Sequence, residues 1–136
     1  MAGLTVMVIV DGEETYSGIG LLLEKRGHRV IEAVNDSQAL EAVKRERPEV
    51  ILMDTDLPPA RSLVVARGLR ERSRLNGAAV VVVVTPHRLA RTEGESLRVA
   101  PDDYVVRQGD FEQLKNILDS LSAEAAALVA NGAGGK

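Results

Sequence analysis

The sequence VMVIVDGEET, residues 6–15, begins with an apolar run that predicts a buried strand. Its apolar start is continuous rather than alternating, which is typical of a parallel strand buried on both faces. The run ends at Asp11, and Gly12 follows it. A carboxylate at the end of a buried strand costs stability unless it caps a helix, is paired or binds a metal. Asp11 is therefore a candidate site residue, and the glycine beside it needs an explanation.

Strands and helices alternate along the chain. Strand patterns occupy residues 4–10, 28–34, 49–54, 78–85 and 102–106. Helical patterns follow them at 15–27, 35–48, 62–76, 89–99 and 110–130, and Gly94 weakens the fourth. This order predicts a doubly wound α/β domain around a five-stranded parallel sheet, the flavodoxin-like topology. We expect one domain over residues 1–130 and a disordered tail over residues 131–136.

Several residues mark where the helices start and stop. Gly27 is placed to end the first helix, and Asn35 with Gln38 has the spacing of a capping box. Asp110 and Gln113 have the same spacing before the last helix. An inward-facing stripe on that helix is predicted from Phe111, Leu114, Leu118 and Leu121.

Composition narrows the class of protein. The chain has 136 residues, 45% of them hydrophobic, with no cysteine and a net charge of -3. Its longest apolar run is too short to cross a bilayer, and its first residues lack the pattern of a signal peptide. Aromatic residues make up only 2%, which with the acidic balance argues against nucleic-acid binding. These features fit a cytoplasmic protein that acts without a membrane or a nucleic acid.

Polar residues end four of the predicted strands. Asp11, Asp54 and Thr85 follow the first, third and fourth strands, and Arg107 follows the fifth. Because ligands bind beyond the carboxyl ends of parallel strands, we expect these side chains to share one crevice. Two neighbouring carboxylates attract a hard divalent cation, and a hydroxyl and a cation can bind phosphoryl oxygens. The set is suited to phosphoryl transfer.

These motifs resemble the receiver domain of bacterial response regulators, the CheY-like phosphoacceptor module of two-component signalling. The resemblance rests on VIVDGEE, VILMDTDLP, VVVVVT and PDDYVVRQ, in the family's order. It implies a signalling switch rather than an enzyme, with Asp54 as the phosphoacceptor. It also implies Mg²⁺ held by Asp11, Asp54 and the Asp56 carbonyl, with Glu13 as a substitute ligand. Thr85, Tyr104 and Arg107 would sense the phosphoryl group.

The resemblance also implies partners. A histidine kinase or a phosphotransfer protein would donate the phosphoryl group. A downstream protein would bind the face formed by helix four, strand five and helix five. A homodimer is compatible with the same pattern.

Four positions depart from the family pattern. Gly12 stands where the second acid is usual, so a bound Mg²⁺ loses an oxygen ligand and its affinity falls. Arg107 and Gln108 replace Lys-Pro, so we expect a trans peptide and a reshaped loop. Pro86 replaces a small residue after Thr85. We expect Arg107 to turn toward Asp54 or Asp11 when no metal is bound.

Three functions are compatible with these departures and with the fold. The chain is either a working phosphoacceptor or an atypical pseudo-receiver that binds proteins without phosphorylation. A flavodoxin-like flavin or nucleotide binder is a third reading, because it would share the topology. It is the weakest, since SGIG lies within a helical pattern and not at the start of one.

Overall fold

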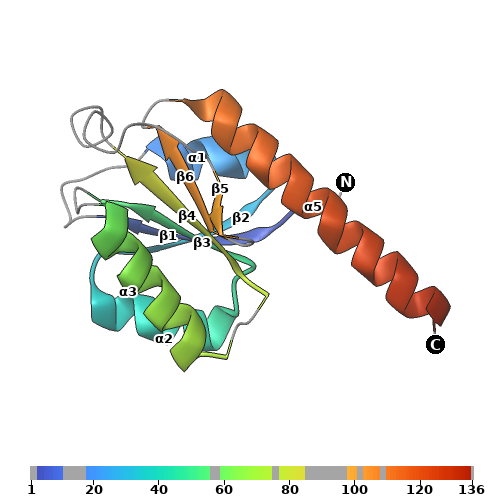
Figure 1. The fold of residues 1–136 in the computed structure, drawn as a ribbon, viewed down its shortest axis with the longest axis horizontal. Helices are drawn as coiled ribbons and strands as arrows, with labels where there is room; N and C mark the ends of the chain where they lie inside the picture. Colours follow the sequence, from blue (N-terminus) through green and yellow to red (C-terminus); the bar gives the residue numbers. More distant parts are fainter. Residues whose placement is uncertain are drawn as a thin grey trace.

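The computed structural model describes residues 3–10, 18–55, 59–74, 77–84, 98–100, 103–107 and 110–135. They form one sheet covered by helices on both faces (Figure 1). The sheet has the strand order β2-β1-β3-β4-β6-β5. Its parallel strands are β1 (Thr5–Val10), β2 (Arg29–Ala33), β3 (Val50–Asp54), β4 (Ala79–Val84) and β6 (Asp103–Arg107). The predicted doubly wound parallel architecture is confirmed.

The three central strands explain why the sequence reads as unbroken apolar runs. β1, β3 and β4 have neighbours on both sides and helices on both faces. Every described side chain from Val50 to Met53 and from Val80 to Val83 is buried. Because both faces are dry, a polar residue has no favourable place until the strand ends.

Predicted signals stand after the end of α1 (Gly18–Lys25) and before the start of α2 (Asp36–Glu46). Gly27 follows α1 with a positive φ of 96°, a conformation that glycine adopts without strain. The Gln38 amide donates to Asn35 Oδ1 at 2.8 Å, as a capping box requires. In return, Gln38 Oε1 accepts from the amide of Val34, one residue earlier than the ideal motif.

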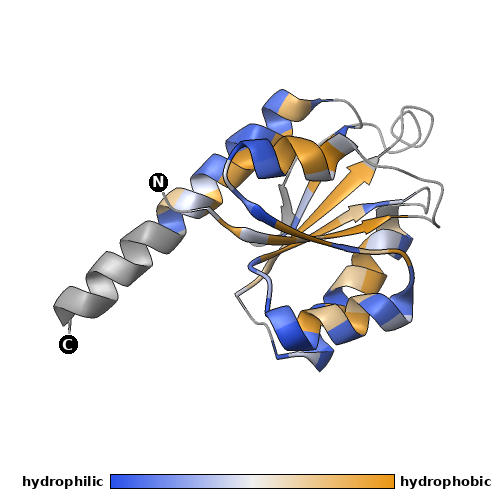
Figure 2. Cartoon of the chain, turned by 180° about the vertical axis from the view of Figure 1, so that it is seen from behind, coloured by the Kyte–Doolittle hydropathy of each residue, from blue (hydrophilic) through white to orange (hydrophobic). Residues whose placement is uncertain are grey.

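Two hydrophobic layers hold the helices on the sheet. One layer joins α1 and α5 (Phe111–Gly135) to the sheet through Leu23, Leu114 and Leu118. The other joins α2 and α3 (Pro59–Arg72) to the opposite face, with Ala66 and Leu69 fully covered. Figure 2 shows the apolar residues concentrated on the strands and on the helix faces turned toward them. Both layers support the carboxyl ends of the strands.

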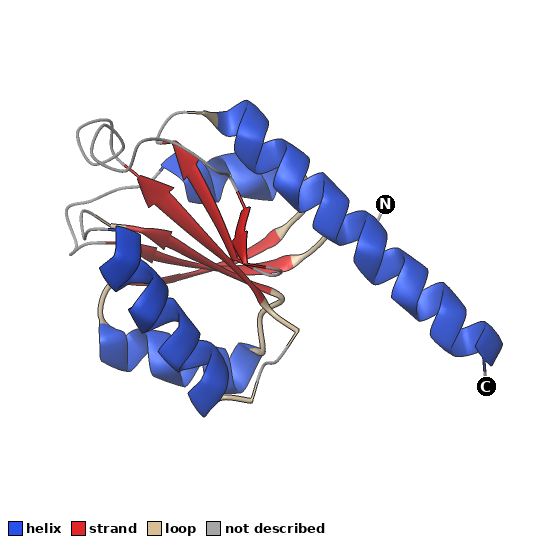
Figure 3. Cartoon of the chain, viewed as in Figure 1, coloured by secondary structure: helices blue, strands red, loops and turns tan. Residues whose placement is uncertain are grey.

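The sheet has a sixth strand that the sequence prediction lacks. β5 (Arg98–Ala100) pairs antiparallel with β6 at the edge of the sheet, shown beside it in Figure 3. Residues 98–99 were predicted to end a weak helix, so this part of the prediction is wrong. Pairing with the otherwise open edge of β6 satisfies backbone groups that a helix end would leave exposed. The remainder of the predicted helix lies outside the described residues.

The last helix is longer than predicted, and one residue of its predicted inward-facing stripe is exposed. α5 continues to Gly135, so the helix includes residues 131–135. The predicted disorder of this tail stays a prediction. The run AEAAALVA, residues 123–130, has high helix propensity and carries the helix past the sheet (Figure 1). Phe111, predicted to face inward, is 44% exposed, whereas Leu114 and Leu118 are buried as expected.

No helix in the described part of the chain combines the length and the hydropathy needed to cross a bilayer.

Candidate functional site

The carboxyl ends of four parallel strands meet at one edge of the sheet, where their arrowheads point the same way (Figure 3). Val10 of β1 lies opposite Asp54 of β3, and Val84 of β4 lies opposite Arg107 of β6. Met53 and Val82 are also paired, so β3 and β4 are in step. The strands that lead to the predicted acids, hydroxyl and cation therefore end together.

The structure describes three of the predicted site residues directly. These are Asp54, Tyr104 and Arg107. The other predicted positions lie outside the described residues, and they are Asp11, Gly12, Glu13, Asp56, Thr85, Pro86 and Gln108. Asp11 and Thr85 follow strand residues Val10 and Val84 directly in the chain, which fixes the edge of the sheet from which each segment starts.

Asp54 is the last residue of β3 and is half-buried. Asp54 takes part in an interaction with another group of the protein. The next residue, Thr55, places Oγ1 3.4 Å from Oγ of Ser62, which is 1% exposed on α3. The segment that carries the predicted phosphoacceptor is thus attached to the first turns of α3 by a hydroxyl contact as well as by the backbone.

Arg107 ends β6 with an exposed side chain. Its backbone amide donates to Gln113 Oε1 at 3.4 Å, and the Gln113 amide donates to Asp110 Oδ1 at 3.1 Å. The backbone amide of Gln113 therefore forms the predicted cap, and its side-chain oxygen connects α5 to the end of β6. The predicted contact from the Arg107 side chain to Asp54 or Asp11 stays a prediction.

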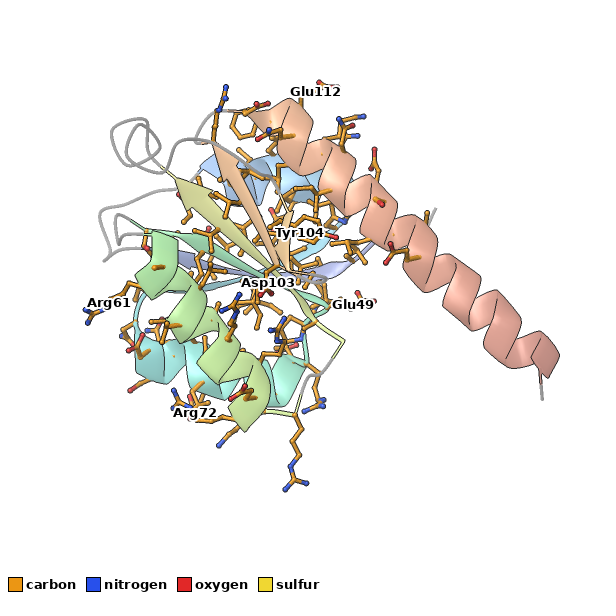
Figure 4. All side chains as sticks on the ribbon, viewed as in Figure 1. Glu49, Arg61, Arg72, Asp103, Tyr104 and Glu112 are labelled. Carbon is orange, nitrogen blue, oxygen red and sulfur yellow. The ribbon has the colours of Figure 1, made fainter. Side chains whose placement is uncertain are left out.

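Tyr104 is half-buried and packs against the layer that includes Val106 and Leu118. The residue before it, Asp103, is only 2% exposed and faces the opposite side of the sheet. Figure 4 shows Asp103 on the α3 side of the sheet and Tyr104 toward α5. Alternation along a strand accounts for this separation of neighbours.

Asp103 is held by two arginines of α3. Arg67 donates from Nε to Asp103 Oδ2 at 2.8 Å, and its Nη2 lies 2.7 Å from the same oxygen. Arg70 donates from Nη1 to Asp103 Oδ1 at 3.1 Å and to the Ala78 carbonyl at 3.1 Å. Sequence reasoning missed this cluster, although RGLR, residues 67–70, places two arginines one helical turn apart.

The described residues hold no group of three acidic or histidine side chains that could bind a metal. Asp54 is the one predicted magnesium ligand among them, because Asp11 and Asp56 lie in segments that the structure does not describe. Carboxylate and carbonyl oxygens are the donors that Mg²⁺ prefers, so the predicted donor set fits this ion by its chemistry.

Known proteins share the fold and the motifs of this chain. The family model of the response regulator receiver domain matches residues 6–119. The polar-differentiation response regulator DivK of Brucella anthropi is 32% identical over 108 residues, which are 79% of each chain. The phosphate regulon transcriptional regulatory protein PhoB of Pseudomonas aeruginosa is 28% identical over 107 residues, covering 79% of this chain and 46% of PhoB.

A solved structure gives the same picture of the fold. The anti-anti-sigma factor PhyR of Bartonella quintana superposes with a TM-score of 0.66 at 20% identity, over 98% of this chain and 52% of that one. The chain thus spans about half the length of PhoB and of PhyR.

The fold is that of the flavodoxin-like α/β class. The chain belongs to the response regulator receiver domain family. Members of this family are switches of two-component signalling, so the predicted class of protein is confirmed.

Proposed function

We propose that this chain is a phosphoacceptor receiver that takes a phosphoryl group on Asp54 and signals through a protein interface. The observation that carries this function is the position of Asp54. It is half-buried at the carboxyl end of β3 and in register with Val10, the residue before Asp11. A carboxylate there is accessible from the edge where a phosphoryl donor would approach.

The transfer is a displacement at phosphorus. A carboxylate oxygen of Asp54 attacks the phosphoryl group of a phosphohistidine on a histidine kinase or phosphotransfer protein. The O–P bond forms as the P–N bond breaks, and the imidazole nitrogen keeps the electron pair and then takes up a proton. Thr85 and Arg107 would bind the phosphoryl oxygens, which need both precise placement and neutralisation of their charge.

Mg²⁺ would neutralise the phosphoryl and carboxylate charges when it is bound. The residues that would hold it are Asp11, Asp54 and the carbonyl of Asp56, with Glu13 as an additional donor. Gly12 supplies no side-chain oxygen, so the site should bind the ion more weakly than one with two adjacent acids. Phosphorylation should accordingly require more Mg²⁺ in the unaltered protein than in the Gly12→Asp variant.

The proposed output surface includes β6 and α5, and the predicted fourth helix that belongs to the same proposed face lies outside the described residues. β6 carries Tyr104 and Arg107, and its end is tied to α5 by Gln113. A change at Asp54 that moves β6 would therefore alter the contact surface of α5. A downstream protein, or a second copy of the chain, would bind there in the cytoplasm.

The alternative function is a pseudo-receiver that binds a protein without phosphorylation. One observation favours it. The exposed Arg107 stands where the family has the slimmer lysine. The planar guanidinium of arginine binds carboxylates in a bidentate manner and could occupy the acceptor oxygens.

Mass spectrometry after incubation with acetyl phosphate and Mg²⁺ separates the two functions. We expect slow modification by one phosphoryl group, localised to Asp54 by borohydride reduction and peptide mapping. The matched control is Asp54→Asn, which should remain unmodified. Absence of modification at every Mg²⁺ concentration would favour the pseudo-receiver.

A further inference from the structure

A continuous series of contacts joins the Asp54 segment to β6 through α3. Thr55 follows Asp54 and contacts Ser62 in the first turns of α3. Farther along α3, Arg67 and Arg70 hold Asp103, the first residue of β6. The two attachments lie on the same helix, so a displacement of α3 at its start is carried to the start of β6.

We call the cluster of Asp103, Arg67 and Arg70 the clamp. It connects α3, which follows β3 in the chain, directly to β6, although β4 lies between β3 and β6 in the sheet. α3 crosses over β4, and Arg70 also donates to the carbonyl of Ala78, just before β4 begins. The helix therefore binds the amino ends of both strands, opposite the edge where Asp54 lies.

β6 carries the clamp and the predicted switch residue on opposite faces. Val105 packs in the layer under α2 and α3, on the same side as Asp103. Tyr104 packs in the layer under α1 and α5. A tilt of β6 imposed from the α3 side must therefore move Tyr104 on the α5 side, because both side chains are fixed to one rigid strand.

We infer that Asp103 is a positioning residue, which couples α3 to Tyr104 and so relays the state of Asp54 to the α5 face; this inference rests on the proposed function. Burying a carboxylate with two arginines costs desolvation free energy, and an apolar side chain could fill the same site without that cost. Paired charges fix the position of α3 along β6 more narrowly than apolar contacts would, because hydrogen bonds from guanidinium to carboxylate are directional.

The role of Asp103 can be tested by following Tyr104 with ¹⁹F NMR. The chain has two tyrosines and no tryptophan, so Tyr16→Phe leaves Tyr104 alone. Incorporated as 3-fluorotyrosine, it gives one ¹⁹F resonance in the full chain. Mg²⁺ with beryllofluoride serves as the phosphoryl mimic, and bound beryllofluoride has separate ¹⁹F signals that report occupancy.

Arg67→Gln removes one arm of the clamp. Its side chain is 41% exposed and Arg70 still pairs with Asp103, so this variant should fold. We expect the displacement of the Tyr104 resonance on saturation with beryllofluoride to fall roughly two-fold or more, with occupancy unchanged. Asp103→Asn should give the same loss. The matched control is Arg61→Gln, the same change at an exposed position of α3, which should leave the displacement as in the parent.

Two outcomes would overturn the role of Asp103, and they are distinguishable. If Arg67→Gln binds beryllofluoride and moves Tyr104 as far as the parent does, the clamp only stabilises the fold, while the phosphoacceptor function stands. If the parent shows no bound beryllofluoride, the proposed function fails and the relay fails with it.

Discussion

At the scale of single residues, the buried carboxylate of Asp103 obtains both of its charged partners from α3. Its side chain is 3% exposed, and its two partners are 41% and 18% exposed. Water can therefore stabilise the arginines far more than the aspartate. The cluster is therefore asymmetric: Asp103 is as buried as a residue of an internal ion pair, whereas Arg67 is as exposed as a residue of a surface ion pair.

Asp103→Ala should lower the free energy of unfolding by about 3 kcal/mol, because Arg70 then loses its charged partner in a largely buried position. Urea denaturation followed by circular dichroism measures this. Asp119→Ala is the control, since it removes an exposed i,i+4 pair with Lys115. That change should cost less than about 0.5 kcal/mol. Equal effects of the two substitutions would show that the clamp adds no more than a surface pair.

His28 gives the fold a pH dependence. The imidazole is buried, and Nδ1 accepts a hydrogen bond from the Leu4 amide at 3.0 Å. Burial and then the charge of Arg26 lower the pKa of His28, while Asp119 and Glu49 oppose them. An imidazole whose Nδ1 accepts a bond at this position must be neutral or lose that bond when it is protonated.

The sign of the effect follows from this lowered pKa. The stabilisation from neutral His28 is complete above the unfolded pKa of about 6.5 and is lost as the pH falls through the folded pKa. His28→Asn keeps an acceptor near Leu4 and does not titrate. Urea unfolding at pH 7.5 and 5.5 should show a smaller loss of stability for this variant than for the parent. A parallel loss in both proteins would assign the pH dependence to other groups.

At the scale of elements, the side chain of Asn35 caps the first turn of α2. Asn35 is the N-cap, in extended conformation, and accepts from the Gln38 amide. Asn35→Ala should lower the free energy of unfolding by about 1 kcal/mol, because one amide of the first turn loses its partner. Ser37→Ala, an exposed change in the same turn, is the control for helix propensity. If the two variants have the same midpoint in urea, the cap contributes nothing.

The elements that sequence could predict are those whose signals are local. The buried parallel strands appear as apolar runs, and Asn35, Gln38 and Gly27 mark helix ends by their own chemistry. β5 was missed because it has three residues and forms only by pairing with β6. The exposure of Phe111 was missed because it depends on where α5 meets the sheet, which helical periodicity does not determine.

At the scale of the whole molecule, the sheet assembles the site. Parallel topology predicted that the strand ends of Asp54 and Arg107 lie at one edge, and the register confirms it. The clamp on Asp103 could not be predicted, because Arg67 and Arg70 lie 36 and 33 residues away in sequence. Only the packing of α3 across β4 reveals that pairing. Gly12, in contrast, is visible in the sequence alone and bears directly on the proposed phosphorylation.

The departures at Gly12 and Arg107 should act on phosphorylation together. Gly12→Asp would add an oxygen ligand for Mg²⁺, and Arg107→Lys would replace a planar fork that can occupy the acceptor oxygens of Asp54. Because one change strengthens the metal site and the other frees the acceptor, the double variant should gain more than either single variant. We expect phosphorylation by acetyl phosphate to be about ten-fold faster or more, equivalent to about 1.4 kcal/mol in the barrier.

Time-resolved mass spectrometry with saturating Mg²⁺ measures these rates. The control adds Asp54→Asn to the double variant, which should abolish modification and so exclude transfer to another acid. A gain in Gly12→Asp alone, equal to that of the double variant, would show that Arg107 does not obstruct Asp54. Rapid and complete modification of the unaltered protein would show instead that its site already works without the second acid. In that case Glu13 or Asp56 would be the residue to replace next, since each is the nearest carboxylate in sequence to one of the two predicted acidic ligands.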